Sequence, residues 1–286
     1  MARYFWYGMA LAVAFAYSAQ ADSPGRVIAA GGSVAEIIHA LGAGDQMIAR
    51  DTTSTYPASV AALPDIGYVR ALSAENLIAM DPDMIIAEHD AGPPEVLEVI
   101  RRTGIPLVIV PHALDPDGIS AKIAAVADAL DLPDAGAALQ ASVTAKLAEA
   151  RAAGAALPHF PRVMFILSMQ GGRLQVAGAG TSAAAMIALA GGTNAVSGLD
   201  GYKPLTDEAA IAAAPDLILM MDRGGDHAVT TADIAAHPAL RLTPAGAAGQ
   251  VVTMDGLYLL GFGPRTGDAA LDLTAHFQRL SDQDDR

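Results

Sequence analysis

The sequence predicts an α/β fold with two Rossmann-like lobes, each built on a parallel sheet, joined by a single long backbone helix. Three observations predict this fold: a duplicated helix-and-strand unit, short apolar strands that alternate with helices, and a helix-forming segment between the two copies. Strands that alternate with helices favour parallel sheets covered by helices on both faces. In such folds a ligand binds at the carboxyl ends of the strands, so we expect a cleft between the lobes.

The duplicated unit is the clearest feature of the chain. Residues 72–86 read LSAENLIAMDPDMII and residues 205–219 read LTDEAAIAAAPDLIL. Ser73 and Thr206 suit helix N-caps, and an acidic residue follows each in the first turn, where the helix dipole favours a carboxylate. A Pro-Asp pair then ends each helix, because proline disfavours helical geometry at the preceding residue. An apolar strand closes both copies.

The similarity continues upstream of this unit. Short apolar strands at 26–29 and 162–166 open the two copies, and alanine-rich helices that end in glycine follow over 33–42 and 181–191. The Gly-Gly-Ser turn at 31–33 offers the backbone N–H groups of an anion-binding loop. We interpret it instead as a tight turn, which is the commoner use of such glycines.

The boundaries follow from this pattern. We expect a signal peptide over 1–21, a first lobe over 22–132, a backbone helix over 133–157 and a second lobe over 158–286. The helix expectation rests on a composition of Ala, Leu, Lys and Glu, all strong helix formers.

The first 21 residues have the order of a secretory signal: a short basic start, an apolar run over 4–17, and small residues before Ala21. A spanning helix would need about 20 apolar residues, which the run does not reach. We therefore expect cleavage after Ala21 and release into a periplasm. The chain has no cysteine for a lipid anchor.

Composition excludes several functions. The 286 residues include no cysteine, which excludes disulfides, thiol catalysis and thiolate metal sites. The net charge of −14 opposes binding to nucleic acid or anionic lipid, since those partners require a basic face. Motifs for a serine-hydrolase elbow, a phosphate-binding loop or a zinc protease are absent from the sequence. We therefore expect a monomeric binding protein that is not an enzyme.

Tyr68 and Arg70 are the residues with the most suggestive chemistry. They lie two positions apart in a loop just before the first repeat helix. A phenolate is a hard oxygen donor suited to ferric iron, and tyrosine is a known axial ligand of haem. A free phenol ionises only at a pH of about 10, but Fe³⁺ and an adjacent guanidinium both favour the anion. Alternatively, Tyr68 is a half-buried loop aromatic and Arg70 a solvated charge.

Motifs along most of the chain resemble those of the periplasmic haem-binding proteins of bacterial haem ABC importers. This family belongs to the helical-backbone class that also captures cobalamin and siderophores. The motifs that carry the resemblance are GYVRALSAE at 67–75, VAGAGT at 176–181, ALAGG at 188–192, YKPLT at 202–206 and LLGFGPR at 259–265. Assignment to haem rests mainly on the Tyr-Val-Arg and LLGFGPR segments.

The resemblance implies a ferric haem held between the lobes as transported cargo. Tyr68 is then the iron ligand, and Arg70 hydrogen-bonds its oxygen. Some members add a histidine from the loop after the first strand of the second lobe, but this sequence has Met169 there, which would pack on the porphyrin. Arg173 and Arg223 are candidates for the haem propionates. From its own position, in a polar loop after a strand, His227 is a candidate ligand.

Glu75 and Glu208 occupy matching positions in the two repeat helices. Their position in the first turn of a helix can be explained by a structural role alone, since the helix dipole favours a carboxylate there. The resemblance implies that such glutamates dock onto arginines of the permease dimer in related proteins.

Two alternatives to a haem-binding protein remain. One is a binding protein for cobalamin or a ferric siderophore, and the other is an exported enzyme with a substrate cleft.

Overall fold

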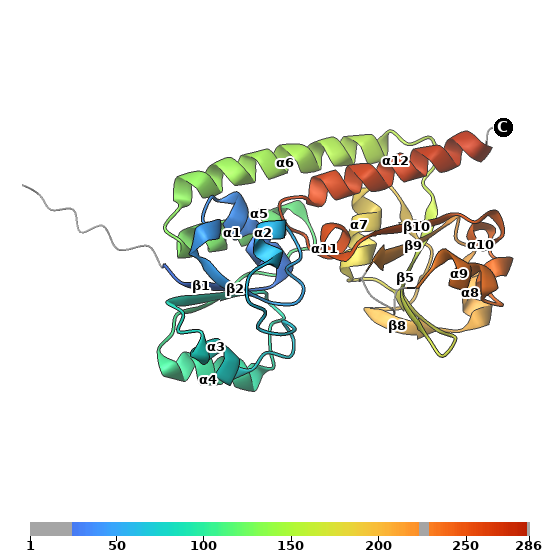
Figure 1. The fold of residues 1–286 in the computed structure, drawn as a ribbon. Helices are drawn as coiled ribbons and strands as arrows, with labels where there is room; N and C mark the ends of the chain where they lie inside the picture. Colours follow the sequence, from blue (N-terminus) through green and yellow to red (C-terminus); the bar gives the residue numbers. More distant parts are fainter. Residues whose placement is uncertain (1–24, 223–228, 285–286) are drawn as a thin grey trace, which may run out of the picture.

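The computed structural model describes residues 25–222 and 229–284 and shows two lobes side by side beneath a pair of long helices (Figure 1). This arrangement confirms the predicted two-lobe α/β fold. The signal segment expected over 1–21 lies outside the described residues, as do Arg223 and His227.

The first lobe is built on a four-stranded, wholly parallel sheet with strand order β2-β1-β3-β4. The strands are β1 (Val27–Ala30), β2 (Met47–Arg50), β3 (Met84–Ala87) and β4 (Leu107–Ile109). The helices are α1 (Gly32–Ala40), η1 (Gly44–Gln46), α2 (Ala58–Ala61), α3 (Ala74–Ala79), α4 (Pro94–Thr103) and α5 (Pro116–Ala129).

Alternation of side chains along β1 shows how helices cover this sheet. Val27 and Ala29 pack into the core formed with α1 and α5, whereas Ile28 packs with Leu77 of α3 and Ile100 of α4. Because successive residues of a strand point to opposite faces, both faces of the sheet are buried, as the uninterrupted apolar strands predicted.

The second lobe holds a six-stranded sheet with the order β10-β9-β5-β6-β8, and β7 pairs with β5. The strands are β5 (Arg162–Gln170), β6 (Arg173–Ala177), β7 (Thr193–Asn194), β8 (Tyr202–Leu205), β9 (Leu217–Asp222) and β10 (Val251–Asp255). The helices are α7 (Ser182–Leu189), α8 (Asp207–Ala213), α9 (Thr231–Ala236), η2 (Leu240–Leu242), α10 (Pro244–Ala248), α11 (Gly256–Leu260) and α12 (Thr266–Asp284).

One detail differs from the expectation of two parallel sheets: the second sheet is mixed. β6 runs antiparallel to both β5 and β8, while β5, β7, β9 and β10 pair in parallel. The reason is the tight connection between β5 and β6, where Gly171 and Gly172 both adopt positive φ, at 59° and 74°. A two-residue turn of this kind joins antiparallel strands, whereas a parallel pair needs a long crossover.

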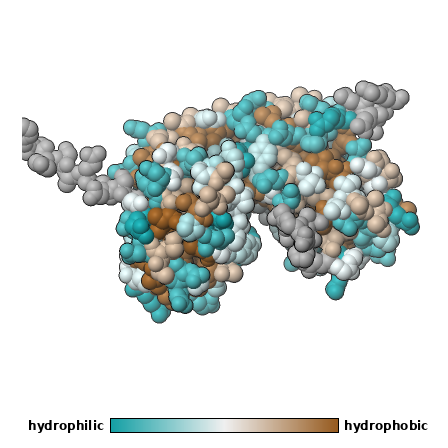
Figure 2. Space-filling view, in the orientation of Figure 1, coloured by the Kyte–Doolittle hydropathy of each residue, from teal (hydrophilic) through white to brown (hydrophobic). Residues whose placement is uncertain are grey.

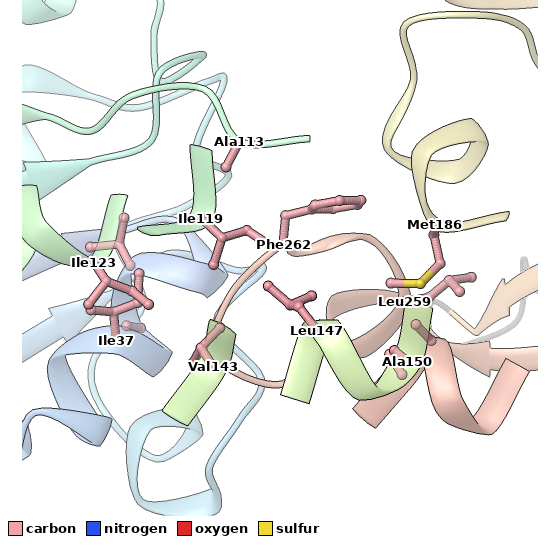
Figure 3. Packing of buried hydrophobic residues seen from close by; sticks show 14 of the residues in the cluster. Ile37, Ala113, Ile119, Ile123, Val143, Leu147, Ala150, Met186, Leu259 and Phe262 are labelled. Atoms are coloured by element: carbon pink, nitrogen blue, oxygen red, sulfur yellow. The ribbon is translucent and has the colours of Figure 1, made fainter. Parts of the chain in front are cut away.

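The lobes are joined by α6 (Pro133–Ala155), and α12 packs along it (Figure 1). The apolar core continues through α6 from one lobe to the other. Val143 of α6 lies toward Ile123 of the first lobe. Leu147 lies nearer to Ile119, and Ala150 lies on the side of Met186 of the second lobe (Figure 3). The sequence predicted the helix α6 but not its long partner α12. Within the described ranges, no helix has the length and apolar character needed to cross a bilayer.

Candidate functional site

The carboxyl ends of the two sheets face one another. The turn after β1 packs against the segment that follows β10: a Cβ added at Gly32 would collide with Leu257, and one added at Gly263 would lie 3.2 Å from the Cβ of Ser33. Figure 2 shows the molecule hollowed between the lobes on the side away from α6. A cleft between the lobes therefore lies where open α/β sheets bind their ligands.

The loop that carries Tyr68 is fixed by buried side chains and by backbone hydrogen bonds. Ile66, Val69 and Leu72 are buried in the core of the first lobe. The backbone of the loop also pairs with the connection after β3, because Gly92 donates to the carbonyl of Val69 (2.9 Å) and accepts from the N–H of Leu72 (2.8 Å). Tyr68 itself is 42% exposed. An exposed phenol thus stands on a rigid loop at the carboxyl edge of the sheet.

Tyr68, Arg70 and Asp90 form a connected polar group. Nη1 of Arg70 donates a hydrogen bond to Oη of Tyr68. Asp90 accepts from Nε of Arg70 at 2.7 Å and from Nη2 at 2.5 Å. Burial alone lowers the pKa of Arg70, but the hydrogen bond and charge of Asp90 raise it above its ordinary value. The guanidinium therefore remains a cation beside the phenol oxygen of Tyr68. Asp90 carries no signal in the sequence, since no local pattern links residues twenty positions apart.

Two histidines that the sequence analysis did not single out lie side by side at the same sheet edge. Nδ1 of His89 and Nδ1 of His112 are 3.2 Å apart, and the ring centroids are 3.9 Å apart. Burial, followed by the charges of His89 and Lys122, lowers the pKa of His112. The two facing nitrogens lie within hydrogen-bonding distance, and the tautomers of the two rings decide which of them donates.

A buried ion pair lies below these histidines. Nζ of Lys122, on α5, is 2.8 Å from Oγ of Ser33 and 3.1 Å from Oε1 of Glu88. Ser33 also donates to the Glu88 carboxylate. Burial raises the pKa of Glu88, but the interaction with His89, whose Nδ1 lies 3.8 Å from Oε2, and the charge of Lys122 outweigh it and lower that pKa to about 2. The group ties β3, α1 and α5 together under the cleft.

The Gly-Gly-Ser turn after β1 serves packing, as we interpreted it. Its backbone donors are already used within the lobe: Gly31 donates to Oδ1 of Asp51 (3.0 Å) and Gly32 to Oγ1 of Thr53 (3.1 Å). Ser54 donates to the same carboxylate at 2.7 Å. Because the buried Asp51 carboxylate takes the place that an anion would occupy, this turn is a structural element.

Met169 and Arg173 lie in the β5–β6 hairpin of the second lobe. Met169 is partly buried against the apolar cluster beneath the sheet, and Arg173 is exposed at the start of β6. In the described part of the chain, neither side chain forms a hydrogen bond or an ion pair with Tyr68 or Arg70. The structure therefore brings Tyr68 and Arg70 together in the first lobe, whereas Met169 and Arg173 lie in the second lobe.

His237 fixes the position of this hairpin. The sequence suggested only that His237 lies in a turn before Pro238. Nδ1 of His237 accepts from the N–H groups of Ala239 (3.3 Å) and Leu240 (3.4 Å). Its other nitrogen, Nε2, therefore carries the proton and donates to the carbonyl of Gly172 at 3.2 Å. This buried imidazole holds the hairpin tip against the loop after α9.

Glu75 and Glu208 both lie exposed in the first turn of short helices, α3 and α8. The predicted caps of these helices are confirmed. Oγ of Ser73 accepts from the N–H of Asn76 at 3.4 Å, and Oγ1 of Thr206 accepts from Ala209 at 3.3 Å. The two carboxylates thus occupy equivalent positions on the two lobes.

The LLGFGPR segment connects the lobes. Arg265 forms an ion pair with Glu36 of α1, and its Cζ lies 3.7 Å from the ring centroid of Tyr56. Burial raises the pKa of Glu36, while Arg265 opposes this rise. Next to this pair, Phe262 is buried at the interface between the lobes (Figure 3). Beside it is a hollow of about 240 Å³, lined by α5, α6 and α7, which contains none of the predicted site residues.

Two lobes, a cleft at facing strand ends and a bridging helix define a ligand-capture protein. The chain belongs to the periplasmic binding protein family, whose sequence profile matches residues 27–258. It is therefore a periplasmic substrate-binding protein and not an enzyme, and membership implies a transporter as partner.

Individual solved structures are also similar to this chain. The periplasmic haem-binding protein BhuT, in complex with two haems, is 42% identical with a TM-score of 0.85, over 89% of this chain and 98% of that one. The periplasmic haem-binding protein RhuT from Roseiflexus sp. RS-1, in its apo form, is 40% identical with a TM-score of 0.86, over 90% and 98%. Haem-binding HutB of Vibrio cholerae is 32% identical with a TM-score of 0.77, over 87% and 97%.

Among curated relatives, the vitamin B12-binding protein of Vibrio parahaemolyticus is 33% identical over 82 residues. This match covers 29% of this chain and only 30% of that protein. The second relative, from Yersinia pestis, is 31% identical over 87 residues, or 31% of its length. The chain therefore matches less than a third of the length of these curated relatives, whereas it matches the three haem-binding structures over nearly their whole length.

Proposed function

We propose that this protein captures ferric haem in the cleft between its lobes and delivers it to the permease dimer of an ABC-type importer. The observation that carries the proposal is the Tyr68–Arg70–Asp90 group at the cleft. It stands in a chain that is 40–42% identical to two haem-binding proteins over nearly their whole length. Haem is cargo in this proposal and not a resident cofactor.

The chemistry of Tyr68 fits the iron of such a cargo. A phenolate is a hard anionic donor, and Fe³⁺ is a hard cation. Oη of Tyr68 already accepts one hydrogen bond from Arg70 and retains a lone pair for a metal. Because Arg70 is oriented by Asp90, the positive charge is in place before the ligand arrives. The exposure of Tyr68 gives a large planar ligand access to the oxygen.

The second lobe supplies the opposite wall in this proposal. Met169 packs on the porphyrin face, and Arg173 and Arg223 pair with the propionates. His227, four positions after Arg223 and likewise outside the described residues, is a candidate second ligand. The exposure of Arg173 at the hairpin supports its proposed pairing with a propionate, since a cation that binds a carboxylate of the cargo must be free of other partners.

Delivery uses the two glutamates. Glu75 and Glu208 project from equivalent helices of the two lobes, and we assign them to docking onto cations of the permease. Exposed carboxylates at the rim of an interface contribute orientation and encounter rate more than affinity.

Titration with hemin tests the cargo. The wild-type chain should develop an intense Soret band and the charge-transfer bands of a ferric phenolate complex. Tyr68→Phe keeps the ring but removes the donor oxygen, so these bands should vanish and affinity should fall by at least about tenfold, or about 1.4 kcal/mol. Met169→Ala, a packing change, should keep the wild-type bands. A Tyr68→Phe protein with an unaltered spectrum and affinity would remove Tyr68 from the site.

A second candidate cargo is cobalamin, favoured by the local similarity to vitamin B12-binding proteins. Titration of the same preparation with cyanocobalamin separates the two. If cobalamin binds and Tyr68→Phe leaves that binding unchanged while hemin fails to bind, the cobalamin assignment replaces haem.

A further inference from the structure

We infer that His89 and His112 form a binding site for a divalent transition-metal ion, such as Zn²⁺ or Cu²⁺, which both rings bind through Nδ1. The inference does not depend on the haem proposal, because the site uses no side chain of the Tyr68–Arg70–Asp90 group. Imidazole nitrogen is a preferred donor for Zn²⁺ and Cu²⁺, whereas Mg²⁺ and Ca²⁺ prefer oxygen. The chemistry of the pair therefore selects a transition-metal ion.

The separation of the two nitrogens carries the inference. Nδ1 of His89 and Nδ1 of His112 are 3.2 Å apart. With zinc–nitrogen distances of about 2.0–2.1 Å, this separation corresponds to an N–Zn–N angle of about 100–106°, close to the tetrahedral value. The ring planes are inclined by 57°, so each ring turns about its Cβ–Cγ bond to direct its lone pair at the ion. The ring that donates from Nδ1 in the hydrogen-bonded pair then carries its proton on Nε2.

The main chain fixes both histidines while their rings stay accessible. His89 lies in a turn that is closed by a hydrogen bond from the N–H of Ala91 to the carbonyl of Glu88 (3.0 Å). His112 follows β4, which pairs in parallel with β3, and precedes the buried Ala113. Both histidines are exposed. An ion from solvent therefore reaches two donors whose backbone positions are already set, which lowers the entropic cost of binding.

The charges and the protonation state around the pair also favour a cation. The two neighbouring cations are each paired with a carboxylate, Lys122 with Glu88 and Arg70 with Asp90. No uncompensated positive charge of these groups therefore opposes the ion. A metal ion binds the neutral form of imidazole. Desolvation lowers the pKa of His112, so protons compete less with the ion for this ring.

Glu88 supports the site through its second carboxylate oxygen. Oε1 is bound by Lys122 and Ser33, whereas Oε2 lies 3.8 Å from Nδ1 of His89. Oε2 can accept a hydrogen bond from water on the ion, as carboxylates around metal sites commonly do. In the described ranges no group of three or more His, Cys, Asp or Glu side chains has the arrangement of a metal site. The ion is therefore bound by two imidazoles and water, more weakly than in a structural site with four protein ligands.

Titration with Zn²⁺ tests the site. The full mature chain is treated with a chelator, desalted and titrated in competition with a coloured zinc indicator, without haem. His89→Ala and His112→Ala should each weaken Zn²⁺ binding by at least about tenfold, since even the loss of a group that only supports a ligand has an effect of this size. His159→Ala, an exposed histidine of the second lobe, is the matched control and should bind as wild type. Thermal melts confirm that the variants fold. A wild-type chain that does not bind Zn²⁺, or histidine variants with wild-type affinity, would overturn the inference.

Cu²⁺ identifies the ligands directly. Pulsed electron paramagnetic resonance detects the remote nitrogen of each imidazole bound to Cu²⁺, and it should find two in the wild type and one in His89→Ala or His112→Ala. Two bound imidazoles in either single variant would place the ion elsewhere and contradict the inference. Tyr68→Phe should keep the Zn²⁺ affinity of the wild type, because the phenol is not a ligand of this ion. Loss of Zn²⁺ binding in Tyr68→Phe would show that the ion binds at the phenol and not at the histidine pair.

Discussion

Asp90 binds Arg70 through a single oxygen, Oδ2, which lies 2.7 Å from Nε and 2.5 Å from Nη2. This leaves Nη1 directed at Oη of Tyr68. Because Asp90 follows β3 and Tyr68 lies in the loop after β2, the contact links the ends of the two strands that flank β1 in the sheet. It fixes a cation beside the one phenol that we propose as an iron ligand.

Weakening this link should reduce hemin affinity in a set order. Arg70→Ala removes the cation and should lower affinity less than Tyr68→Phe, since the ligand oxygen remains. Asp90→Asn should have the smallest effect, a few-fold, because the amide still accepts one hydrogen bond from Arg70. Hemin titrations of the three variants measure the order. An Asp90→Asn effect as large as that of Tyr68→Phe would contradict the indirect role assigned to Asp90.

Reduction of the iron should weaken binding. Fe²⁺ is softer than Fe³⁺ and gains less from an anionic oxygen. We expect the wild-type complex to lose affinity when dithionite is added, and Tyr68→Phe to show little difference between the two oxidation states. Paired ferric and ferrous titrations under nitrogen measure the ratio. Equal ferric and ferrous affinities in the wild type would argue against a phenolate ligand.

The Glu88–Lys122 pair should make the free energy of unfolding fall at acidic pH. The folded pKa of Glu88 is about 2, against an ordinary value of 4.5. The folded state therefore binds fewer protons at this site, so the contribution is complete above about pH 4.5 and is lost as the pH falls toward 2. The shift corresponds to roughly 3 kcal/mol. Urea unfolding followed by circular dichroism at several pH values should show this loss.

Substitutions provide the control for that pair. Glu88→Gln should flatten the acid dependence and cost about 3–5 kcal/mol at neutral pH, because the buried Lys122 ammonium loses its partner. Glu88→Gln/Lys122→Met should recover part of that loss. A Glu88→Gln protein that keeps the wild-type acid dependence would show that another carboxylate is responsible.

Charge reversal at the docking glutamates should separate transport from binding. Glu75→Lys/Glu208→Lys should leave the hemin titration unchanged, since neither residue contacts the Tyr68 group in the described structure. Uptake of haem by whole cells should fall strongly, because two cations would meet the cations of the permease. Normal uptake by the double variant would leave these residues with a helix-terminal role only.

Phe262 should couple the lobes. Phe262→Ala removes a buried ring from the interface and should cost about 3–5 kcal/mol in urea unfolding. It should also increase the radius of gyration in small-angle X-ray scattering, as the lobes separate. The matched control is Phe160→Ala, since Phe160 is 60% exposed and its loss should change neither quantity. A stable, equally compact Phe262→Ala protein would show that α6 and α12 hold the lobes without it.

Sequence patterns predicted the features that lie within a single helix or strand. The repeat predicted α3 and α8 with their caps, because the capping serine and threonine and the Pro-Asp pair lie within one element. The hairpin of β5 and β6 also had a local signal, in Gly171 and Gly172 between apolar runs. We interpreted that signal as a loop, and so expected a parallel sheet.

Contacts between distant elements had no such signal. Glu88 meets Lys122 and Ser33 only because β3, α5 and α1 converge at one edge of the sheet. The pairing of His89 with His112 likewise follows from the adjacency of β3 and β4. Tyr68 and Arg70 could be found because they are two residues apart; their third member, Asp90, could not.

The uninterrupted apolar core through α6 has a kinetic consequence. Lobes that share one core resist a change in their separation, so we expect a ligand to enter the cleft without a slow rearrangement, at a rate set by diffusion and orientation. The lifetime of the loaded protein is then governed by the strength of its contacts alone. Rapid release would then require a partner to move the two lobes apart against this shared core.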